Sequence, residues 1–133
     1  MVLLLTLPFI GCGNKLCSVS GTVSIDGTPV SGGDDGLGTV SFYRESGGAP
    51  GIGFIDKSGR YDLKTGGQAG IEPGPYRIAI NIKKIAPPVN QDALPKATLI
   101  SHPKYGRITE SGLRADVKTG QNTIDFALSS KGP

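Results

Sequence analysis

Short segments in which apolar and polar residues alternate recur along this chain from residue 18 onward. In the first, Val19, Gly21, Val23 and Ile25 alternate with serine and threonine, and the longest is 76–82, Tyr-Arg-Ile-Ala-Ile-Asn-Ile. A period of two places successive side chains on opposite faces of an extended chain, which is the pattern of a half-buried β-strand. No helical period longer than one turn is found, so the sequence predicts an all-β fold.

Turn residues separate the alternating segments. Asp26-Gly27 suits a type I′ hairpin turn, because both positions tolerate a positive φ, and turns are also expected at 56–59 and 118–121. About seven short strands, with turns about every 8–12 residues, predict a single seven-stranded antiparallel β-sandwich. We place this domain at residues 18–130, and Ile52 and Phe54 mark its third strand. The apolar member of each alternation is expected in the core.

Residues 85–108 break the rhythm, because they contain four prolines and show no alternation. Long loops without secondary structure are usually functional or disordered. We therefore expect a long proline-rich loop over 85–108. It is either a binding loop that presents His102 and Tyr105, or a surface loop whose Tyr105 packs against the edge of the sandwich.

The N-terminal segment differs from the rest of the chain. Its apolar run, residues 2–10, is shorter than the roughly 20 residues that span a bilayer as a helix, and it fits the apolar part of a signal peptide. The tetrapeptide Phe9-Ile10-Gly11-Cys12 resembles a bacterial lipobox, although Phe9 stands where Leu or Val is usual. A buried N-terminal strand and a secretory signal cut by the ordinary peptidase are the alternatives.

The lipobox resemblance implies three segments: a lipoprotein signal peptide over 1–11, a lipid-anchored linker over 12–17, and the β-sandwich. Cys12 is then the lipidation site, with a diacylglyceryl thioether and an amide-linked acyl chain such as palmitate. No lysine or arginine precedes the apolar run, so we expect translation to start upstream of Met1. Two acyl chains are enough for stable anchoring.

This interpretation predicts a location in the cell envelope, on a membrane surface that faces the periplasm or the exterior. Gly13 follows Cys12 where Asp would favour inner-membrane retention, so the outer membrane is favoured. With Cys12 acylated, Cys17 is left without a disulfide partner. We expect Cys17 to be a small buried residue at the start of a strand, with a reactive or intermolecular thiol as the alternative.

The residues do not support catalysis. His102 is the only histidine, and it lies in the proline-rich segment. Zinc normally needs three or four ligands, and no hydrolase or phosphate-binding motif occurs. We expect no enzyme activity, metal or cofactor. The pair Asp34-Asp35 is interpreted as part of a turn, with calcium binding as the alternative. The net charge of +3 is small and dispersed, which argues against a nucleic-acid partner.

Three segments resemble carboxypeptidase regulatory-like domains. They are the opening strand and turn (19–30), Gly59-Arg-Tyr-Asp-Leu-Lys-Thr65, and Pro73-Gly-Pro-Tyr-Arg-Ile78 with its Pro-Gly-x-Tyr step. The tail, 105–126, is similar to small lipoproteins of this type that are abundant in Planctomycetes. The resemblance implies a transthyretin-like sandwich in which the Pro-Gly-x-Tyr step leads into a central strand. It also implies a surface location. The zinc domain of the carboxypeptidases is absent.

Taken together, these features predict a non-enzymatic, lipid-anchored lipoprotein with a structural or protein-interaction role, whose strand edges are open to β-augmentation. A carbohydrate- or calcium-binding module at the cell surface is the alternative. The chain has no tryptophan, and Tyr61 and Tyr76 follow the core-facing alternation. Tyr43 and Tyr105 are therefore the candidate stacking platform. The expected partners are the membrane, through the lipid anchor, and a protein or glycan of the envelope.

Overall fold

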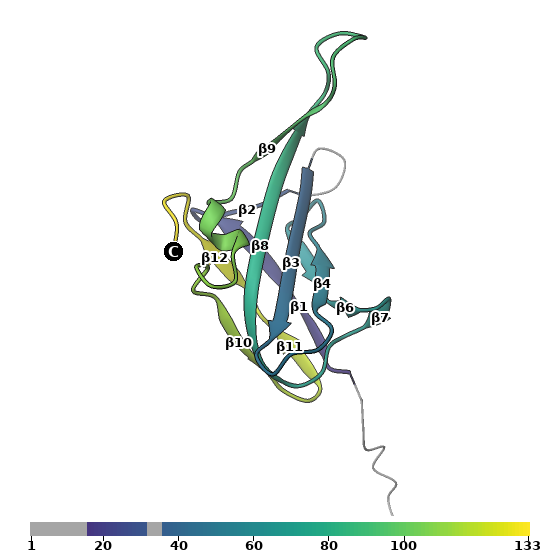
Figure 1. The fold of residues 1–133 in the computed structure, drawn as a ribbon, viewed down its shortest axis with the longest axis vertical. Coiled ribbons are helices and arrows are strands. Elements are labelled where there is room, and N and C mark those ends of the chain that lie inside the picture. Colours follow the sequence, from purple (N-terminus) through teal and green to yellow (C-terminus); the bar gives the residue numbers. More distant parts are fainter. Residues whose placement is uncertain (1–15, 32–35) are drawn as a thin grey trace, which may run out of the picture.

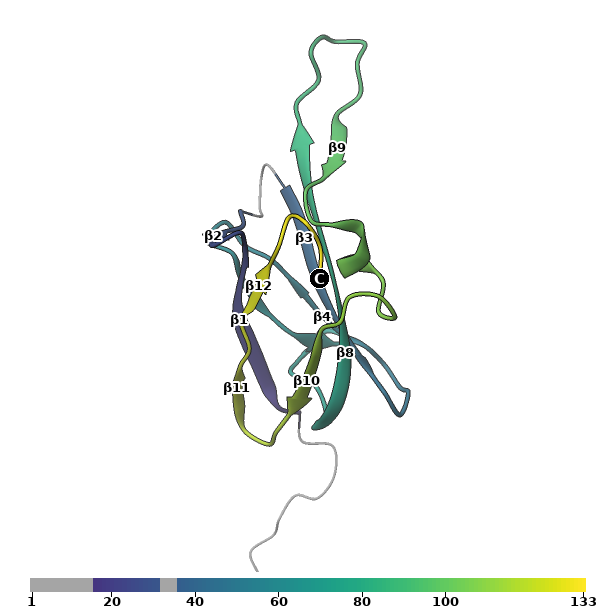
Figure 2. The same ribbon diagram turned by 90° about the vertical axis from the view of Figure 1, so that its left-hand side faces the viewer.

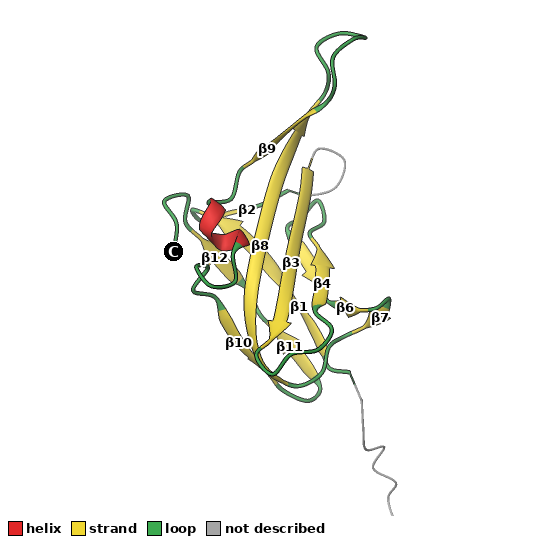
Figure 3. Cartoon of the chain, viewed as in Figure 1, coloured by secondary structure: helices red, strands yellow, loops and turns green. Residues whose placement is uncertain are grey.

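The computed structural model describes residues 16–31 and 36–133, and most of its regular structure is β-strand. Figure 3 shows one short helical turn beside the strands, the 3-10 helix η1 (Pro103–Gly106). The strands in chain order are β1 (Ser18–Ile25), β2 (Thr28–Pro29), β3 (Gly36–Arg44), β4 (Gly51–Phe54), β5 (Arg60–Asp62), β6 (Lys64–Thr65), β7 (Gln68–Ala69), β8 (Gly74–Ala86), β9 (Lys96–Leu99), β10 (Arg114–Val117), β11 (Gln121–Thr123) and β12 (Phe126–Leu128).

The strands form two sheets that face each other (Figures 1 and 2). In the five-stranded sheet, β1 is central and pairs with β2, β5, β11 and β12. The seven-stranded sheet has the order β10-β8-β3-β4-β6-β7, with β9 added to β8. The longest ladder joins β3 to β8 from Gly36↔Lys84 to Arg44↔Tyr76. This arrangement confirms the predicted all-β sandwich.

The prediction of a purely antiparallel sandwich is wrong at the last strand. β11 and β12 both pair with β1 in parallel, and Ser18↔Gln121 and Val23↔Phe126 belong to one register. They act as a single strand interrupted at Ile124–Asp125. The chain crosses from β10 in one sheet to β11 in the other, so its last strand runs in the direction of β1. Interruptions of this kind also explain why the described residues form twelve short strands and not seven.

The hairpin turn predicted at Asp26-Gly27 is confirmed. Asp26 has φ 51° and Gly27 has φ 84°, and the flanking pair Ile25↔Thr28 closes a two-residue loop between β1 and β2. The Asp26 carboxylate also accepts a hydrogen bond from the Ser130 N–H at 3.1 Å. The turn therefore ties the first hairpin to the C-terminal segment.

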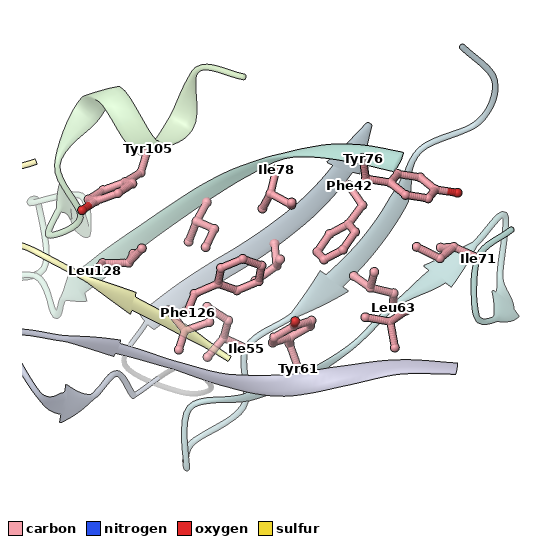
Figure 4. Packing of buried hydrophobic residues seen from close by; sticks show 14 of the residues in the cluster. Phe42, Ile55, Tyr61, Leu63, Ile71, Tyr76, Ile78, Tyr105, Phe126 and Leu128 are labelled. Atoms are coloured by element: carbon pink, nitrogen blue, oxygen red, sulfur yellow. The ribbon is translucent and has the colours of Figure 1, made fainter. Parts of the chain in front are cut away.

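The core lies between the sheets and is centred on aromatic rings from both of them (Figure 4). Phe42 of β3 lies 5.8 Å from Tyr76 and 6.0 Å from Phe126 of β12, centroid to centroid. Tyr61 lies 6.0 Å from Phe126. Tyr61 and Tyr76 are buried, as their alternation predicted. Burial raises the pKa of Tyr61, which therefore stays protonated and donates its hydroxyl hydrogen to the Ile124 carbonyl.

The segment 85–108 is not the structureless loop that its sequence predicts. β8 continues to Ala86, and β9 pairs with it from Lys83↔Leu99 to Ala86↔Lys96, so the two strands form a hairpin. The prolines that hid this pairing, Pro87, Pro88 and Pro95, lie in the connection at its tip, where no ladder donor is needed. The chain then returns through η1 to the sandwich.

Cys17 is buried, with 2% of its surface exposed, and its thiol is free. It lies just before β1 and bridges to Ile71, with the Cys17 N–H donating to the Ile71 carbonyl. This is the buried position at a strand start that the sequence predicts. Across residues 16–31 and 36–133, the structure has no helix with the length and apolar character needed to cross a bilayer.

Candidate functional site

β4 exposes its apolar side chains and buries its glycines. Ile52 is 38% exposed and Phe54 is 73% exposed, whereas Gly51 and Gly53 face the interior. The expectation that the apolar residues of this strand belong to the core is therefore wrong. A phenylalanine with most of its surface in water is unusual on a small domain, because burying it would be favourable. This reversal makes β4 the starting point for a candidate site.

The cause of the reversal is the close approach of later chain segments to the inner face of β4. A Cβ atom on Gly53 would lie 2.8 Å from the Asp62 carbonyl oxygen, and one on Gly51 would lie 2.2 Å from Ile71 Cγ2. The inner positions are thus filled by Leu63 and Ile71, both buried. Ile52 and Phe54, on the opposite face of the strand, point to solvent.

The strand after β4 begins as its hairpin partner and then leaves it. Ile52 pairs with Lys64, and the Asp56 N–H donates to the Arg60 carbonyl at 2.8 Å near the turn. Between these two points β5 pairs with β1 of the other sheet, through Gly21↔Tyr61 and its neighbours. The chain thus crosses from one sheet to the other along this side of the sandwich (Figure 1).

A hollow of about 520 Å³ lies over this crossing, and we call it the β4 groove. Ile52 and Phe54 form its apolar part, and the outward residues of the crossing strand supply alternating charges. Arg60, Asp62 and Lys64 are all exposed. The complete lining is Pro50, Ile52, Phe54, Asp56, Arg60, Asp62, Lys64, Gly66 and Gly67. The groove therefore offers an exposed aromatic ring beside both signs of charge.

Asp56 is the best-ordered carboxylate of the groove, because it closes the predicted turn at 56–59. Its Oδ1 accepts hydrogen bonds from the Ser58 hydroxyl at 2.7 Å, the Ser58 N–H at 2.9 Å and the Arg60 N–H at 3.0 Å. The Ser58 hydroxyl contributes most to lowering the pKa of the Asp56 carboxyl, followed by the two N–H donors. Asp56 thus stays ionised at the turn and fixes where the crossing strand begins.

We expect Asp56→Ala to lower the free energy of unfolding at neutral pH, with the difference from the native chain shrinking in acid. The unfolded carboxyl, with its higher pKa, binds a proton first, so the contribution of Asp56 is present above pH 3.8 and is lost as the pH falls through the folded pKa. Urea unfolding at neutral pH and below pH 3.8 measures the difference. Ser58→Ala, which keeps the carboxylate, should give an intermediate result. A difference that does not change with pH would contradict the expectation.

The structure separates the two tyrosines of the predicted platform. Tyr43 lies on the outer face of β3, 39% exposed and paired in register with Arg77. Tyr105 is only 4% exposed, and its hydroxyl oxygen accepts a hydrogen bond from the Ser129 N–H at 2.9 Å. Tyr105 packs into the core from η1 (Figure 4). No ring face of Tyr105 is left for a ligand, so the structure does not support a joint platform of Tyr43 and Tyr105.

The other predicted residues fall outside the β4 groove. Cys12 and the pair Asp34-Asp35 lie outside the described residues. His102 caps η1, where its Nδ1 accepts a hydrogen bond from the Lys104 N–H at 3.2 Å, and its ring contacts Tyr105 edge-on. Within residues 16–31 and 36–133, no three His, Cys, Asp or Glu side chains gather as metal ligands.

The sequence analysis missed the groove residues, although a signal was present. Gly51-Ile-Gly-Phe54 has glycine at every second position. Glycine within a strand often marks a place where another backbone approaches closely, and such an approach leaves the apolar residues on the opposite face. The same pattern therefore indicates an exposed apolar pair as readily as a core strand.

No family model matches the chain, and no curated protein matches it. Among solved structures, it is similar to the crystal structure of a 9R-lipoxygenase from Cyanothece PCC8801, with 12% sequence identity and a TM-score of 0.37. The match covers 86% of this chain and 16% of that chain, so this chain spans about one sixth of the lipoxygenase. A likeness at this TM-score carries no inference about the activity of the present chain.

Proposed function

We propose that the chain is a non-enzymatic, lipid-anchored β-sandwich lipoprotein of the cell envelope that binds a protein partner through the β4 groove. The observation that carries the proposal is the outward placement of Ile52 and Phe54. Adjoining exposed apolar side chains, rimmed by polar ones, mark interaction sites on soluble domains. Aromatic and arginine side chains are also the common anchors of protein interfaces, and Phe54 and Arg60 both line this groove.

The proposal includes membership of the carboxypeptidase regulatory-like, transthyretin-like domains. Its support is the position of the Pro-Gly-x-Tyr step, Pro73-Gly74-Pro75-Tyr76, which leads into β8. β8 lies between β3 and β10 in the larger sheet, in keeping with the central strand that the resemblance implies. The lipid anchor at Cys12, with the outer membrane favoured, rests on the lipobox resemblance.

A photo-crosslinking amino acid placed at position 54 in the native host tests the partner site. We expect a crosslinked protein adduct from this position and none from the same amino acid at Ala127, an exposed position on the other sheet. Adding Arg60→Ala should reduce the yield at position 54. Equal yields from positions 54 and 127 would contradict the proposal.

Metabolic labelling with a fatty-acid analogue tests the anchor separately. The native chain is expected to carry the label and to fractionate with membranes, whereas Cys12→Ala should lose the label. Cys17→Ala is the matched control and should keep it, because Cys17 is buried in the domain. An unlabelled native chain that retains residues 1–11 would refute the anchor without affecting the groove.

A carbohydrate ligand is the second candidate, and the same groove favours it, since an exposed aromatic ring beside charged hydrogen-bonding groups suits a sugar. Ligand binding to the native state raises the unfolding midpoint. A glycan panel that raises the midpoint of the native chain but not of Phe54→Ala would establish this function. Calcium added alone tests the Asp34-Asp35 alternative in the same assay.

A further inference from the structure

The β8–β9 hairpin projects beyond the two sheets, at the opposite end of the sandwich from the start of β1 (Figures 1 and 2). β3 accompanies β8 only as far as Gly36↔Lys84, and beyond that point β9 is its partner, up to Ala86↔Lys96. The connection over 87–95 forms the tip, with one turn in which the Ala93 N–H donates to the Asn90 carbonyl. The hairpin is thus an extension built on the central strand of the larger sheet.

The tip of the hairpin carries the most exposed large apolar side chains of the described residues. Val89 is 91% exposed and Leu94 is 87% exposed. Three of the tip residues are prolines, Pro87, Pro88 and Pro95, which have no backbone N–H. Fewer backbone donors lower the cost of moving such a tip out of water, because an unpaired polar group is expensive in an apolar medium.

The hairpin and the short segment after it hold the whole net charge of the protein. Residues 83–104 contain four lysines and one aspartate, which equals the +3 of the full chain, and basic and acidic residues balance elsewhere. The charge is therefore not dispersed, as the sequence alone suggested. Lys83, Lys84 and Lys96 lie exposed behind the apolar tip and form no ion pair with another described residue.

We infer that the hairpin tip inserts into the interface of an anionic lipid bilayer, as a membrane contact separate from the Cys12 anchor. Apolar side chains enter the boundary between headgroups and acyl chains without needing a shaped pocket. Lysines just behind them attract anionic headgroups. A nucleic acid fits less well, because residues 83–100 include no aromatic side chain on which a base would stack.

Co-sedimentation with vesicles tests this contact in the full chain with Cys12→Ser, a background that removes lipidation. The vesicles are phosphatidylcholine alone, or equal amounts of phosphatidylcholine and phosphatidylglycerol. We expect binding to the anionic vesicles, with partitioning reduced about tenfold or more by Val89→Ser with Leu94→Ser. Lys83→Gln, Lys84→Gln and Lys96→Gln together should reduce it at least as much. Residues 2–10 are common to every variant, so their own affinity for lipid cancels.

Ile52→Ser with Phe54→Ser is the matched control, because it removes an exposed apolar pair away from the hairpin. It should partition like the parent chain, and unfolding midpoints should show that each variant is folded. Three results would overturn the inference: no binding to anionic vesicles, equal binding to both vesicle types, or equal losses from the hairpin and control substitutions. Binding of the hairpin to an acidic protein but not to vesicles would also overturn it. None of these outcomes bears on the groove or on the acylation of Cys12.

Discussion

Gly21→Ala is expected to destabilise the domain by about 3 kcal/mol or more, the upper part of the range for overpacked sites. An alanine Cβ at this position would lie 1.9 Å from the Ile124 carbonyl oxygen and 2.6 Å from its carbon. The obstacle is backbone, which cannot move aside as a flexible side chain does. Moving it would also disturb the hydrogen bonds from the Ile124 N–H to the Ser20 carbonyl, at 2.8 Å, and from the Thr22 N–H to Asp125, at 2.8 Å.

Urea unfolding followed by circular dichroism measures this loss. Ser24→Ala, on the same strand but half exposed, is the control and should change the free energy of unfolding by less than about 0.5 kcal/mol. If Gly21→Ala were as mild as its control, the close contact between β1 and the interruption of the last strand would be wrong.

Phe42→Ala is the second substitution with a large expected effect, a loss of about 3–5 kcal/mol of stability. Phe42 is completely buried and links Tyr76 of its own sheet to Phe126 of the other. Truncating it removes apolar contacts on both sides and leaves a cavity between the sheets, which the surrounding rings fill only in part.

Phe54→Ala provides a control with the same chemical change. Phe54 is 73% exposed, so its removal should change the free energy of unfolding by less than about 0.5 kcal/mol. The pair distinguishes a core phenylalanine from a surface one on neighbouring strands of one sheet. Similar losses for both variants would show that β4 is facing the wrong way in our description.

The strongest alternations were the most predictable part of the fold. In β1 and β8 the apolar residues are β-branched or aromatic at every second position, and the structure buries them as expected. Asp26-Gly27 identified its hairpin because a two-residue loop there needs positive φ at both positions. In these elements local propensity and global packing agree, so the residues alone were sufficient.

The candidate site was the part that the sequence alone could not predict. Whether Ile52 and Phe54 face inward depends on where Asp62 and Ile71 pass, and that is set by long-range packing. Tyr105 likewise looked accessible in a proline-rich segment, but a hydrogen bond to Ser129 holds it in the core. The parallel pairing of the last strand depends on how the chain crosses between sheets, which leaves no local trace in the residues.

The central position of β1 has a consequence for the order in which the domain is completed. This first strand takes its neighbours from the far end of the chain, as in the Thr22–Asp125 contact, whose partners are 103 residues apart in sequence. Such distant pairing slows folding. A polypeptide threaded N-terminus first through a narrow pore therefore cannot finish its smaller sheet until its final residues have emerged, and it stays extended, in the form that translocation requires.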